Sequence, residues 1–149
     1  MTSDIQPLHE QLCFTLYAAS HAMTRVYKPL LEPLGLTYTQ YIALLALWDQ
    51  DGLSVKALGE RLTLDSGTLT PLIKRLEAAD LVMRSRDPDD ERLVRVYLTP
   101  QGKALRERAR SVQDGAFCAT GMDMGAIADL RAQLAKLQEK LVTSAASPG

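Results

Sequence analysis

The stretch LSVKALGERLTLDSGTLTPLIKRLEAA, residues 53–79, decides the fold, because it holds two short amphipathic segments separated by three residues. Ser54 can cap the first segment as a helix. The second segment carries apolar side chains at positions i, i+3, i+4 and i+7, the spacing of one helix face: Leu69, Leu72, Ile73 and Leu76. Two short helices joined by the turn at residues 63–65 predict a helix-turn-helix.

Pro71 is an irregularity in the second of these helices. Its nitrogen carries no hydrogen, so it cannot donate to the carbonyl four residues earlier. We therefore expect this helix either to begin late, near Thr68, or to bend at Pro71.

The hydrophobic pattern changes from helical to alternating after residue 80. The segments LVMRSR (81–86) and LVRVYL (93–98) flank the charged sequence DPDDER. In the later segment two sets of side chains alternate: Val94, Val96 and Leu98 on one face, Leu93, Arg95 and Tyr97 on the other. This alternation predicts a β-hairpin with a charged tip. A hairpin directly after a helix-turn-helix is the layout of a winged helix, so the expected fold class is mainly α with a small β wing (α+β).

Further helices are expected on both sides of this lobe. The first should end near Tyr27, because Pro29 disfavours helical geometry at Lys28. Two later helix starts are marked by caps: Thr37 with Gln40, and Thr99 followed by Pro100.

Narrow apolar seams run along the first and the last of these helices. They comprise Leu12, Leu16, Ala19, Met23, Val26 and Leu30 in the first, and Ile127, Leu130, Leu134, Leu137 and Leu141 in the last. Two heptads are too few for a free coiled coil, so the last helix must pack on another element. The seams could form an intramolecular core, but two of them at opposite ends of a small domain leave a surplus that favours a homodimer. We expect one domain, residues 1–149, with dimerisation helices at 1–35 and 100–145 and the winged helix-turn-helix lobe at 36–99.

The composition is that of an ordinary globular domain, with 149 residues of which 46% are hydrophobic and 23% charged. No stretch approaches the roughly 20 uncharged apolar residues of a membrane span, and the N-terminus lacks the pattern of a signal peptide. We therefore expect a cytoplasmic protein without a membrane partner. Its two cysteines, Cys13 and Cys118, are too few for a disulfide scaffold and would be thiols in a reducing compartment.

The net charge of −1 and the pI near 6.1 argue by themselves against a nucleic-acid binder. The distribution of charge favours one, because residues 56–110 hold 12 Lys and Arg against 9 Asp and Glu. Positive charge is therefore concentrated around the helix-turn-helix and the hairpin.

Small side chains, most of them hydroxyls, lie on the second helix opposite its apolar stripe: Ser66, Thr68, Thr70 and Pro71. A helix in a major groove reads base edges near its N-terminus, and short side chains allow close approach. Lys74 and Arg75 suit phosphate contacts. At the hairpin tip Arg92 is suited to a minor groove, with Asp90 orienting its guanidinium. Three further arginines are more typical of a solvated face: Arg84, Arg86 and Arg95.

The segment LTLDSGTLTPLIKRLE, together with DPDDER and LTPQG, resembles the MarR family of dimeric winged-helix repressors over nearly the whole chain. LCFTLY near the start, combined with LDSGTLTPL, resembles the OhrR group, repressors that sense organic hydroperoxides through a cysteine. The resemblance implies a homodimer, a palindromic double-stranded DNA operator and an organic hydroperoxide as oxidant. Asp80 departs from the family, which usually has Gly there, but Asp tolerates a left-handed cap better than most residues.

Cys13 has two interpretations, a small packing residue or a reactive thiol. It shares a helix stripe with hydroxyl side chains: Tyr17, Ser20, Thr24 and Tyr27. Hydroxyl donors stabilise a thiolate, the form that attacks a peroxide oxygen. Tyr27 lies about 21 Å from Cys13 along one helix and cannot reach it within one chain. The resemblance implies that Tyr27 and Tyr38 approach the partner subunit's Cys13.

Cys118 also has two interpretations: a small packing residue or, as the resemblance to the two-cysteine type of OhrR implies, the resolving thiol. Oxidised Cys13 would form an intersubunit disulfide with it, although the sequence leaves an intrachain bridge open. Disulfide formation would move the dimerisation helices. It would thereby change the roughly 34 Å spacing between the two recognition helices, which are the second helix of the helix-turn-helix in each subunit, and so derepress the target gene.

Two other functions fit parts of the sequence. A thiol peroxidase would use Cys13 but leaves the helix-turn-helix unexplained. A MarR-type repressor of a small phenolic ligand would leave Cys13 structural. His9, His21 and the cysteines form no recognisable metal-ligand set, and no nucleotide-binding or catalytic-triad pattern occurs, so neither cofactor nor metal is expected.

Overall fold

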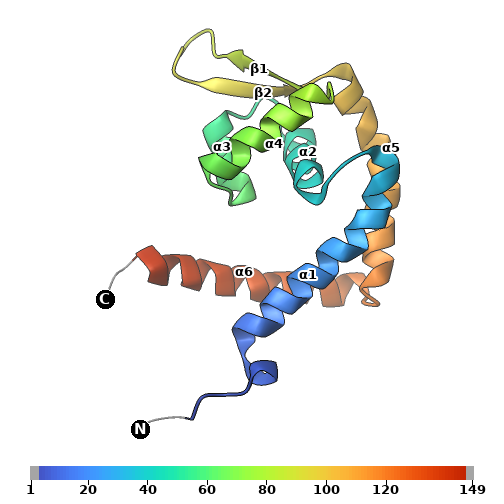
Figure 1. The fold of residues 1–149 in the computed structure, drawn as a ribbon, viewed down its shortest axis with the longest axis vertical. Coiled ribbons are helices and arrows are strands. Elements are labelled where there is room, and N and C mark those ends of the chain that lie inside the picture. The colour runs from blue at the N-terminus through green and yellow to red at the C-terminus, as the bar shows by residue number, and fades with distance from the viewer. Residues whose placement is uncertain (1–3, 147–149) are drawn as a thin grey trace. The chain divides into compact units, whose positions relative to one another are not determined.

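The computed structural model describes residues 4–146, so the expected domain limits at 1 and 149 lie outside the described residues. The chain forms two compact units, residues 1–116 and 117–149. The first contains Leu8–Glu10 (3₁₀), α1 (Leu12–Leu31), Glu32–Leu34 (3₁₀), α2 (Tyr38–Asp49), α3 (Val55–Leu62), α4 (Ser66–Ala78), β1 (Val82–Arg86), β2 (Val94–Leu98) and most of α5 (Pro100–Ala119). The second contains the end of α5 and α6 (Met124–Ala146) (Figure 1).

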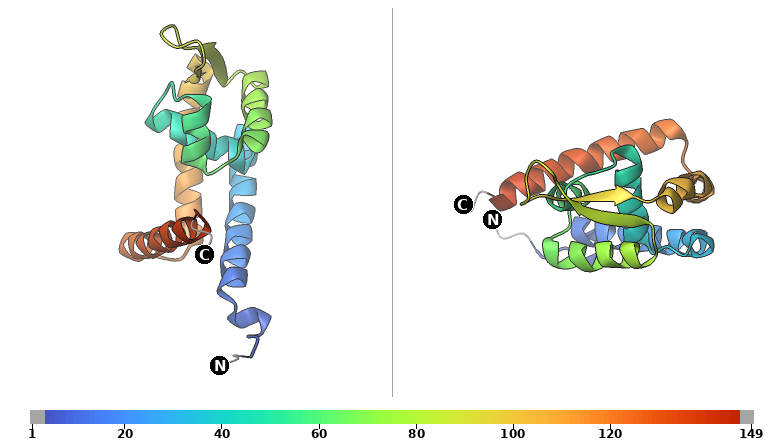
Figure 2. Two further views of the ribbon diagram at one scale, coloured as in Figure 1. Left: turned by 90° about the vertical axis from the view of Figure 1, so that its left-hand side faces the viewer. Right: turned by 90° about the horizontal axis from the view of Figure 1, so that it is seen from above.

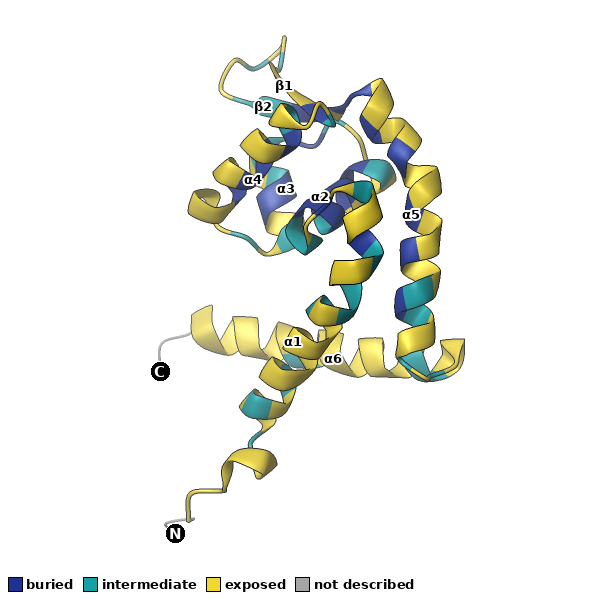
Figure 3. Ribbon diagram, turned by 45° about the vertical axis from the view of Figure 1, so that its right-hand side comes forward, coloured by how far each residue is buried: buried dark blue, intermediate teal, exposed yellow. Residues whose placement is uncertain are grey.

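The first unit contains a winged helix-turn-helix, formed by the elements from α2 to β2, as the sequence predicts. Helices α2, α3 and α4 pack through side chains that are 0–2% exposed: Leu44, Leu47, Leu58, Leu69, Ile73 and Leu76. The buried positions of these helices face one another, while their outer positions are exposed (Figure 3). The antiparallel strands β1 and β2 extend from this core as the wing (Figure 2).

Side-chain caps fix where the helices of the lobe begin. Thr37 and Gln40 form the predicted capping box, and Ser54 Oγ accepts the N–H of Ala57 at 3.0 Å. Asp65 Oδ1 accepts the N–H of Thr68 at 2.8 Å, so α4 begins at Ser66. Of the two expected alternatives, the late start near Thr68 is wrong, because the Asp65 cap holds a helical turn in front of Pro71; the bend at Pro71 stays a prediction.

Helix α1 continues to Leu31 with Pro29 inside it, so the expected end near Tyr27 is also wrong. Leu31 is only 1% exposed, and Tyr27 and Leu30 pack against the core. The burial of these side chains outweighs the hydrogen bond that Pro29 cannot donate. Gly35, with φ of 69°, then ends the 3₁₀ helix Glu32–Leu34 on the way to α2.

The hairpin keeps the predicted alternation. Val82 pairs with Leu98 and Arg84 with Val96, and the inward side chains Val82, Val96 and Leu98 are buried. The segment before α3 adds to β2, since the N–H of Val96 donates to the carbonyl of Leu53 at 2.9 Å. The wing is therefore attached to the loop between α2 and α3 as well as to α4.

Asp80 ends α4 in the left-handed conformation, with φ of 62°. The N–H of Leu81 donates to the carbonyl of Leu76 at 3.0 Å, a bond that closes the helix end. The departure from Gly at this position is thus accommodated by the same backbone geometry that Gly would adopt.

A hydrogen-bonded joint connects this turn to α5. Thr99 is 8% exposed, and its hydroxyl donates to the carbonyl of Asp80 at 2.6 Å and accepts the N–H of Gly102 at 3.0 Å. The indole N–H of Trp48 in α2 donates to the carbonyl of Gly102 at 2.9 Å. The expected cap at Thr99 is confirmed, and it also locks the first turn of α5 to the lobe.

Both terminal helices expose apolar side chains. In α6 none of the described residues is buried, and Leu130, Leu134 and Leu141 are 41–55% exposed. In the seam of α1, Leu12 is 59% and Met23 41% exposed. The predicted seams are therefore largely uncovered in these described segments.

Within residues 4–146, no single helix has both the length and the hydropathy of a bilayer span; α1 with its 3₁₀ extension and α2 meet the test only together, across a 75° bend.

Candidate nucleic-acid interface and redox site

The outer face of α4 presents the residues expected to contact DNA. Ser66, Thr68, Thr70, Pro71, Lys74 and Arg75 are all exposed on it. The opposite face is anchored in the core, with Leu69 at 2% and Leu76 at 0% exposure. Anchoring one face fixes the direction of the other, so the small side chains and the two cations share one accessible surface.

The start of α4 carries a negative charge that the helix itself stabilises. The backbone N–H of Thr68, helped by its hydroxyl and by the N–H of Gly67, lowers the pKa of the Asp65 carboxyl. A carboxylate at a helix N-terminus is favourable because free N–H groups and the helix dipole face it. Asp65 was expected only as a turn residue; its position three residues before Thr68 is the signal for its capping role.

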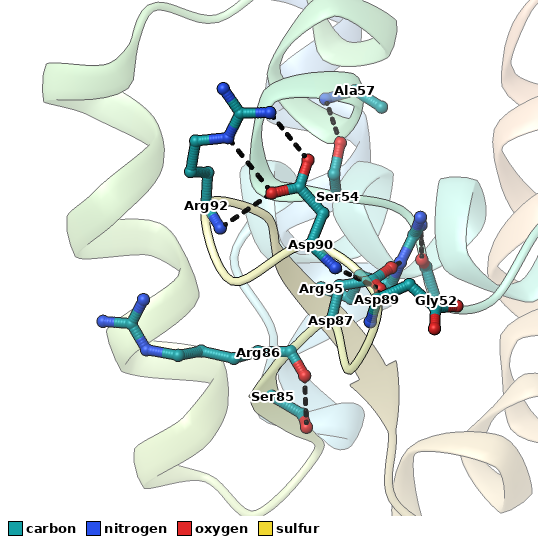
Figure 4. Close-up of polar contacts among 10 residues, drawn as sticks. All are labelled: Gly52, Ser54, Ala57, Ser85, Arg86, Asp87, Asp89, Asp90, Arg92 and Arg95. Carbon is teal, nitrogen blue, oxygen red and sulfur yellow. Dashed lines mark hydrogen bonds and ion pairs between the residues drawn. The ribbon is translucent and has the colours of Figure 1, made fainter.

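The wing tip presents Arg92, whose side chain is 91% exposed. Its Nε lies 3.1 Å from Asp90 Oδ1 and its Nη2 lies 3.4 Å from Oδ2, so the expected pair between these residues is present (Figure 4). The backbone N–H of Arg92 also donates to Asp90 Oδ1 at 3.1 Å. The carboxylate therefore holds both the backbone and the guanidinium of Arg92.

The three arginines expected on a solvated face each have a protein partner. Arg84 Nε lies 2.7 Å from Glu77 Oε1 in α4, and Arg86 Nη1 donates to the carbonyl of Glu91 at 2.8 Å. Arg95 Nε donates to Asp87 Oδ2 at 2.6 Å. Arg84 and Arg86 are exposed, as expected of a solvated face, whereas the side chain of Arg95 is only 34% exposed.

Three tyrosines form a cluster between α1 and α2. The ring of Tyr27 lies 5.2 Å from that of Tyr38 and 5.5 Å from that of Tyr41, centroid to centroid. Burial, and then the neighbouring phenols, raise the pKa of Tyr27 and Tyr41. Both hydroxyls therefore stay protonated at neutral pH and can donate hydrogen bonds. Tyr41 was missed, although its place three residues after Tyr38 puts it on the same side of α2.

The thiol of Cys13 is exposed in the first turn of α1, so in this chain it is not a buried packing residue. Tyr17 follows one helical turn later, 60% exposed, with its ring 4.3 Å from that of His21. Tyr27 lies 14 residues from Cys13 on the same continuous helix, about 21 Å along its axis. The phenol cluster and the thiol of one chain are therefore separate.

Cys118 is exposed near the end of α5, in the second unit. Gly121, with φ of 63°, follows the helix, and its N–H donates to the carbonyl of Cys118 at 3.1 Å. Across residues 4–146, no group of three His, Cys, Asp or Glu side chains is arranged to hold a metal ion.

The sequence matches the MarR family over residues 36–94. The HTH-type transcriptional regulator TtmR of Methylorubrum extorquens is 47% identical over 144 residues, covering 97% of this chain and 74% of the relative. This chain belongs to the MarR family. The organic hydroperoxide resistance transcriptional regulator of Bacillus subtilis is 54% identical over 106 residues, which cover 71% of this chain and 72% of the relative.

Among solved structures, reduced AbfR bound to DNA aligns with a TM-score of 0.74 and 31% identity, covering 91% of this chain and 94% of that one. AbfR, from Staphylococcus epidermidis, also aligns in an overoxidised, DNA-bound form and in a disulfide form. The chain is a DNA-binding transcriptional regulator of the MarR family, and its relatives are regulators rather than enzymes. A thiol peroxidase is therefore contradicted.

Proposed function

We infer that this regulator binds an inverted-repeat operator as a homodimer and leaves it when an organic hydroperoxide oxidises Cys13. The observation that carries this function is the exposed thiol of Cys13 on the helix that brings Tyr27 to Tyr38, in a chain 54% identical to an organic hydroperoxide resistance regulator. Protonated phenols can donate to a thiolate, and a thiolate so stabilised attacks peroxides.

The homodimer is supported by the uncovered apolar side chains of α1 and α6. Leu12 is 59% exposed and Leu141 55%, and none of the described residues of α6 is buried. Antiparallel contact between two copies of α1 would bring Tyr27 of one chain to Cys13 of the other, which one chain cannot do by itself. The contact between subunits that buries these side chains would therefore also complete the thiol site.

Operator binding is supported by the surface of α4 and by the wing. Ser66, Thr68 and Thr70 would contact base edges with Pro71 beside them, and Lys74 and Arg75 would contact phosphates. Arg92, held by Asp90, would enter the adjacent minor groove. Two copies spaced by about 34 Å would place both recognition helices on one face of the duplex.

The redox step consumes one hydroperoxide for each disulfide. The Cys13 thiolate attacks the terminal peroxide oxygen, the O–O bond breaks, and the products are a sulfenic acid and an alcohol once the alkoxide takes a proton. The thiol of the partner subunit's Cys118 then displaces water from the sulfenic acid and forms the disulfide. A second thiol pair reduces the disulfide and restores the starting state.

Disulfide formation, rather than oxidation alone, is proposed as the release step. AbfR has been solved on DNA in both reduced and overoxidised forms, and separately in a disulfide form. In that protein an overoxidised form is thus compatible with DNA binding. A covalent bond between chains, by contrast, requires Cα atoms within about 7 Å and so fixes the relative positions of the helices that carry the thiols.

The test is operator binding by fluorescence anisotropy before and after cumene hydroperoxide, combined with non-reducing electrophoresis. The probe is a duplex of about 30 base pairs that the reduced protein selects from a randomised pool. Wild type should lose affinity as a disulfide-linked dimer appears, and dithiothreitol should restore binding. Cys13→Ser should stay bound, and Cys118→Ser should be oxidised without releasing DNA. Release of Cys13→Ser by the peroxide would refute the mechanism.

A small-ligand repressor is a second candidate, favoured by one observation. A groove of about 690 Å³ lies between α3, the start of α4 and the wing. Its lining includes apolar side chains, three cations and one acid: Leu64, Leu93, Val94, Lys56, Arg84, Arg92 and Glu60. Its size suits a small organic anion. Release of Cys13→Ser from the operator by an aromatic carboxylate, without peroxide, would support this candidate.

A further inference from the structure

We propose that Arg95 is a positioning residue for operator binding, which acts through Asp87 to fix the wing tip that presents Arg92. The inference rests on the proposed function in one respect, that Arg92 contacts DNA. It concerns a side chain on β2 that lies behind the tip and forms two hydrogen bonds, one within the wing and one to the loop between α2 and α3 (Figure 4).

Arg95 connects the tip to the body of the lobe. Its Nε donates to Asp87 Oδ2 at 2.6 Å, and its Nη1 donates to the carbonyl of Gly52 at 3.0 Å. Gly52 belongs to the loop between α2 and α3, and its own N–H donates to the carbonyl of Val96 at 3.1 Å. The guanidinium fork thus spans a separation of 43 residues in sequence and holds Asp87 against a loop that is fixed to β2.

Asp87 in turn organises the backbone of the tip. Its Oδ1 accepts the N–H groups of Asp89 at 2.8 Å and Asp90 at 3.2 Å, and its side chain is only 12% exposed. The hydrogen bond from Arg95 is the main cause that lowers the pKa of the Asp87 carboxyl. Asp87 therefore remains a carboxylate and can accept all three donors at once.

The series of hydrogen bonds from Arg95 ends at the exposed guanidinium of Arg92. Asp90, placed by its backbone bond to Asp87, accepts from the backbone and from Nε of Arg92. Without Arg95, Asp87 loses its charged donor, and the loop from 87 to 93 would have to be ordered when DNA binds. Ordering a loop and a long side chain on binding costs affinity, by about 10-fold for one or two such groups.

The competing explanation is that Arg95 contacts a DNA phosphate directly. The substitution Arg95→Lys distinguishes this explanation from positioning. Lysine keeps the charge but lacks the fork that reaches Asp87 and Gly52 together. A phosphate contact would tolerate Arg95→Lys, whereas positioning would not.

The experiment is a double-mutant cycle on the selected operator duplex, measured by anisotropy between 50 and 200 mM salt. The proteins are wild type, Arg92→Ala, Arg95→Gln, Arg95→Lys and Arg84→Gln, together with the three double variants that combine each of the last three changes with Arg92→Ala. Arg84→Gln is the matched control, because Arg84 is an arginine of the same hairpin with 38% exposure whose ion pair is with Glu77 in α4 and not with the tip. Thermal unfolding shows whether each variant is folded. If Arg95→Gln does not fold, Arg95→Lys decides the test.

Arg92→Ala should weaken binding by about 10-fold and lower the salt slope by about 1. Arg95→Gln and Arg95→Lys should each weaken binding by about 10-fold in the wild type, and by less than about 2-fold when Arg92 is already alanine. The effect of Arg84→Gln should be equal in both backgrounds.

Full, additive losses from the Arg95 variants in the Arg92→Ala background would overturn the inference, as would an Arg95→Lys protein that binds like wild type. Both results would leave the proposed function intact. A protein that selects no operator, or an Arg92→Ala protein that binds like wild type, would refute the role given to Arg92 and the inference with it.

Discussion

Replacing Gly102 by alanine tests the joint between the winged lobe and α5. A Cβ atom at Gly102 would lie 2.1 Å from the carbonyl oxygen of Leu81, well inside the 3.0 Å limit of real contacts. The obstacle is backbone, so no side-chain rotation relieves it. Either the first turn of α5 or the turn before β1 must move.

Such a movement affects three hydrogen bonds. The carbonyl of Leu81 accepts the N–H of Thr99 at 3.0 Å, and Gly102 itself is bonded to Thr99 Oγ1 and to Trp48 Nε1. Overpacking costs about 1–3 kcal/mol and each weakened bond up to about 1 kcal/mol, while alanine returns at most about 1 kcal/mol of helix propensity. We expect Gly102→Ala to lower the free energy of unfolding by about 2–4 kcal/mol.

The measurement is urea denaturation at matched protein concentration, followed by the fluorescence of the single tryptophan and by circular dichroism. Trp48 reports the joint directly, because its indole bonds to Gly102. A Gly102→Ala protein within about 0.5 kcal/mol of wild type, or more stable, would refute the steric reasoning.

Three other changes have defined outcomes. Gly125→Ala, in the first turn of α6, meets no atom nearer than 3.4 Å and should stabilise the protein by up to about 1 kcal/mol in the same denaturation assay. Leu76→Ala removes a side chain that is 0% exposed and should cost about 2–5 kcal/mol; a smaller loss would mean that the core closes over the cavity. Because the pKa of Asp65 is lowered in the folded state, its charge stabilises the fold above its ordinary pKa, and this contribution disappears as the pH falls through the lower folded value. The stability difference between wild type and Asp65→Asn should therefore shrink below about pH 4, and a constant difference from pH 7 to pH 2 would contradict the stabilising role of the Asp65 charge.

The sequence predicted the helix starts correctly wherever a side-chain cap within a few residues fixes them. The Thr37 capping box, the Ser54 cap and the Thr99 cap all act within three residues, and each helix begins as predicted. The errors came at prolines, where the local rule was outweighed. Around Pro29 the burial of Leu31 keeps α1 helical, and that burial depends on helices distant in sequence.

The candidate sites divide in the same way. The pair Asp90 and Arg92 was foreseeable because its members lie two positions apart in the sequence. The bond from Arg95 to Gly52 was not, because the hairpin register and the α2–α3 loop must both be known before these residues become neighbours. Tyr41 lay between the two cases, since its helix face was predictable but its contact with Tyr27 depends on how α1 crosses α2.

The position of the tyrosines explains why sulfur chemistry would reach the DNA-binding surface under the proposed function. Tyr38 and Tyr41 lie at the start of α2. Trp48, in the last turn of the same helix, is hydrogen-bonded to the first turn of α5. Between these ends α2 contributes Leu44 and Leu47 to the core that anchors α4. A close-packed core transmits displacement instead of absorbing it. Under the proposed function, a shift of the phenols after reaction of the partner's thiol would strain α2, and the shared core would carry that strain to α4.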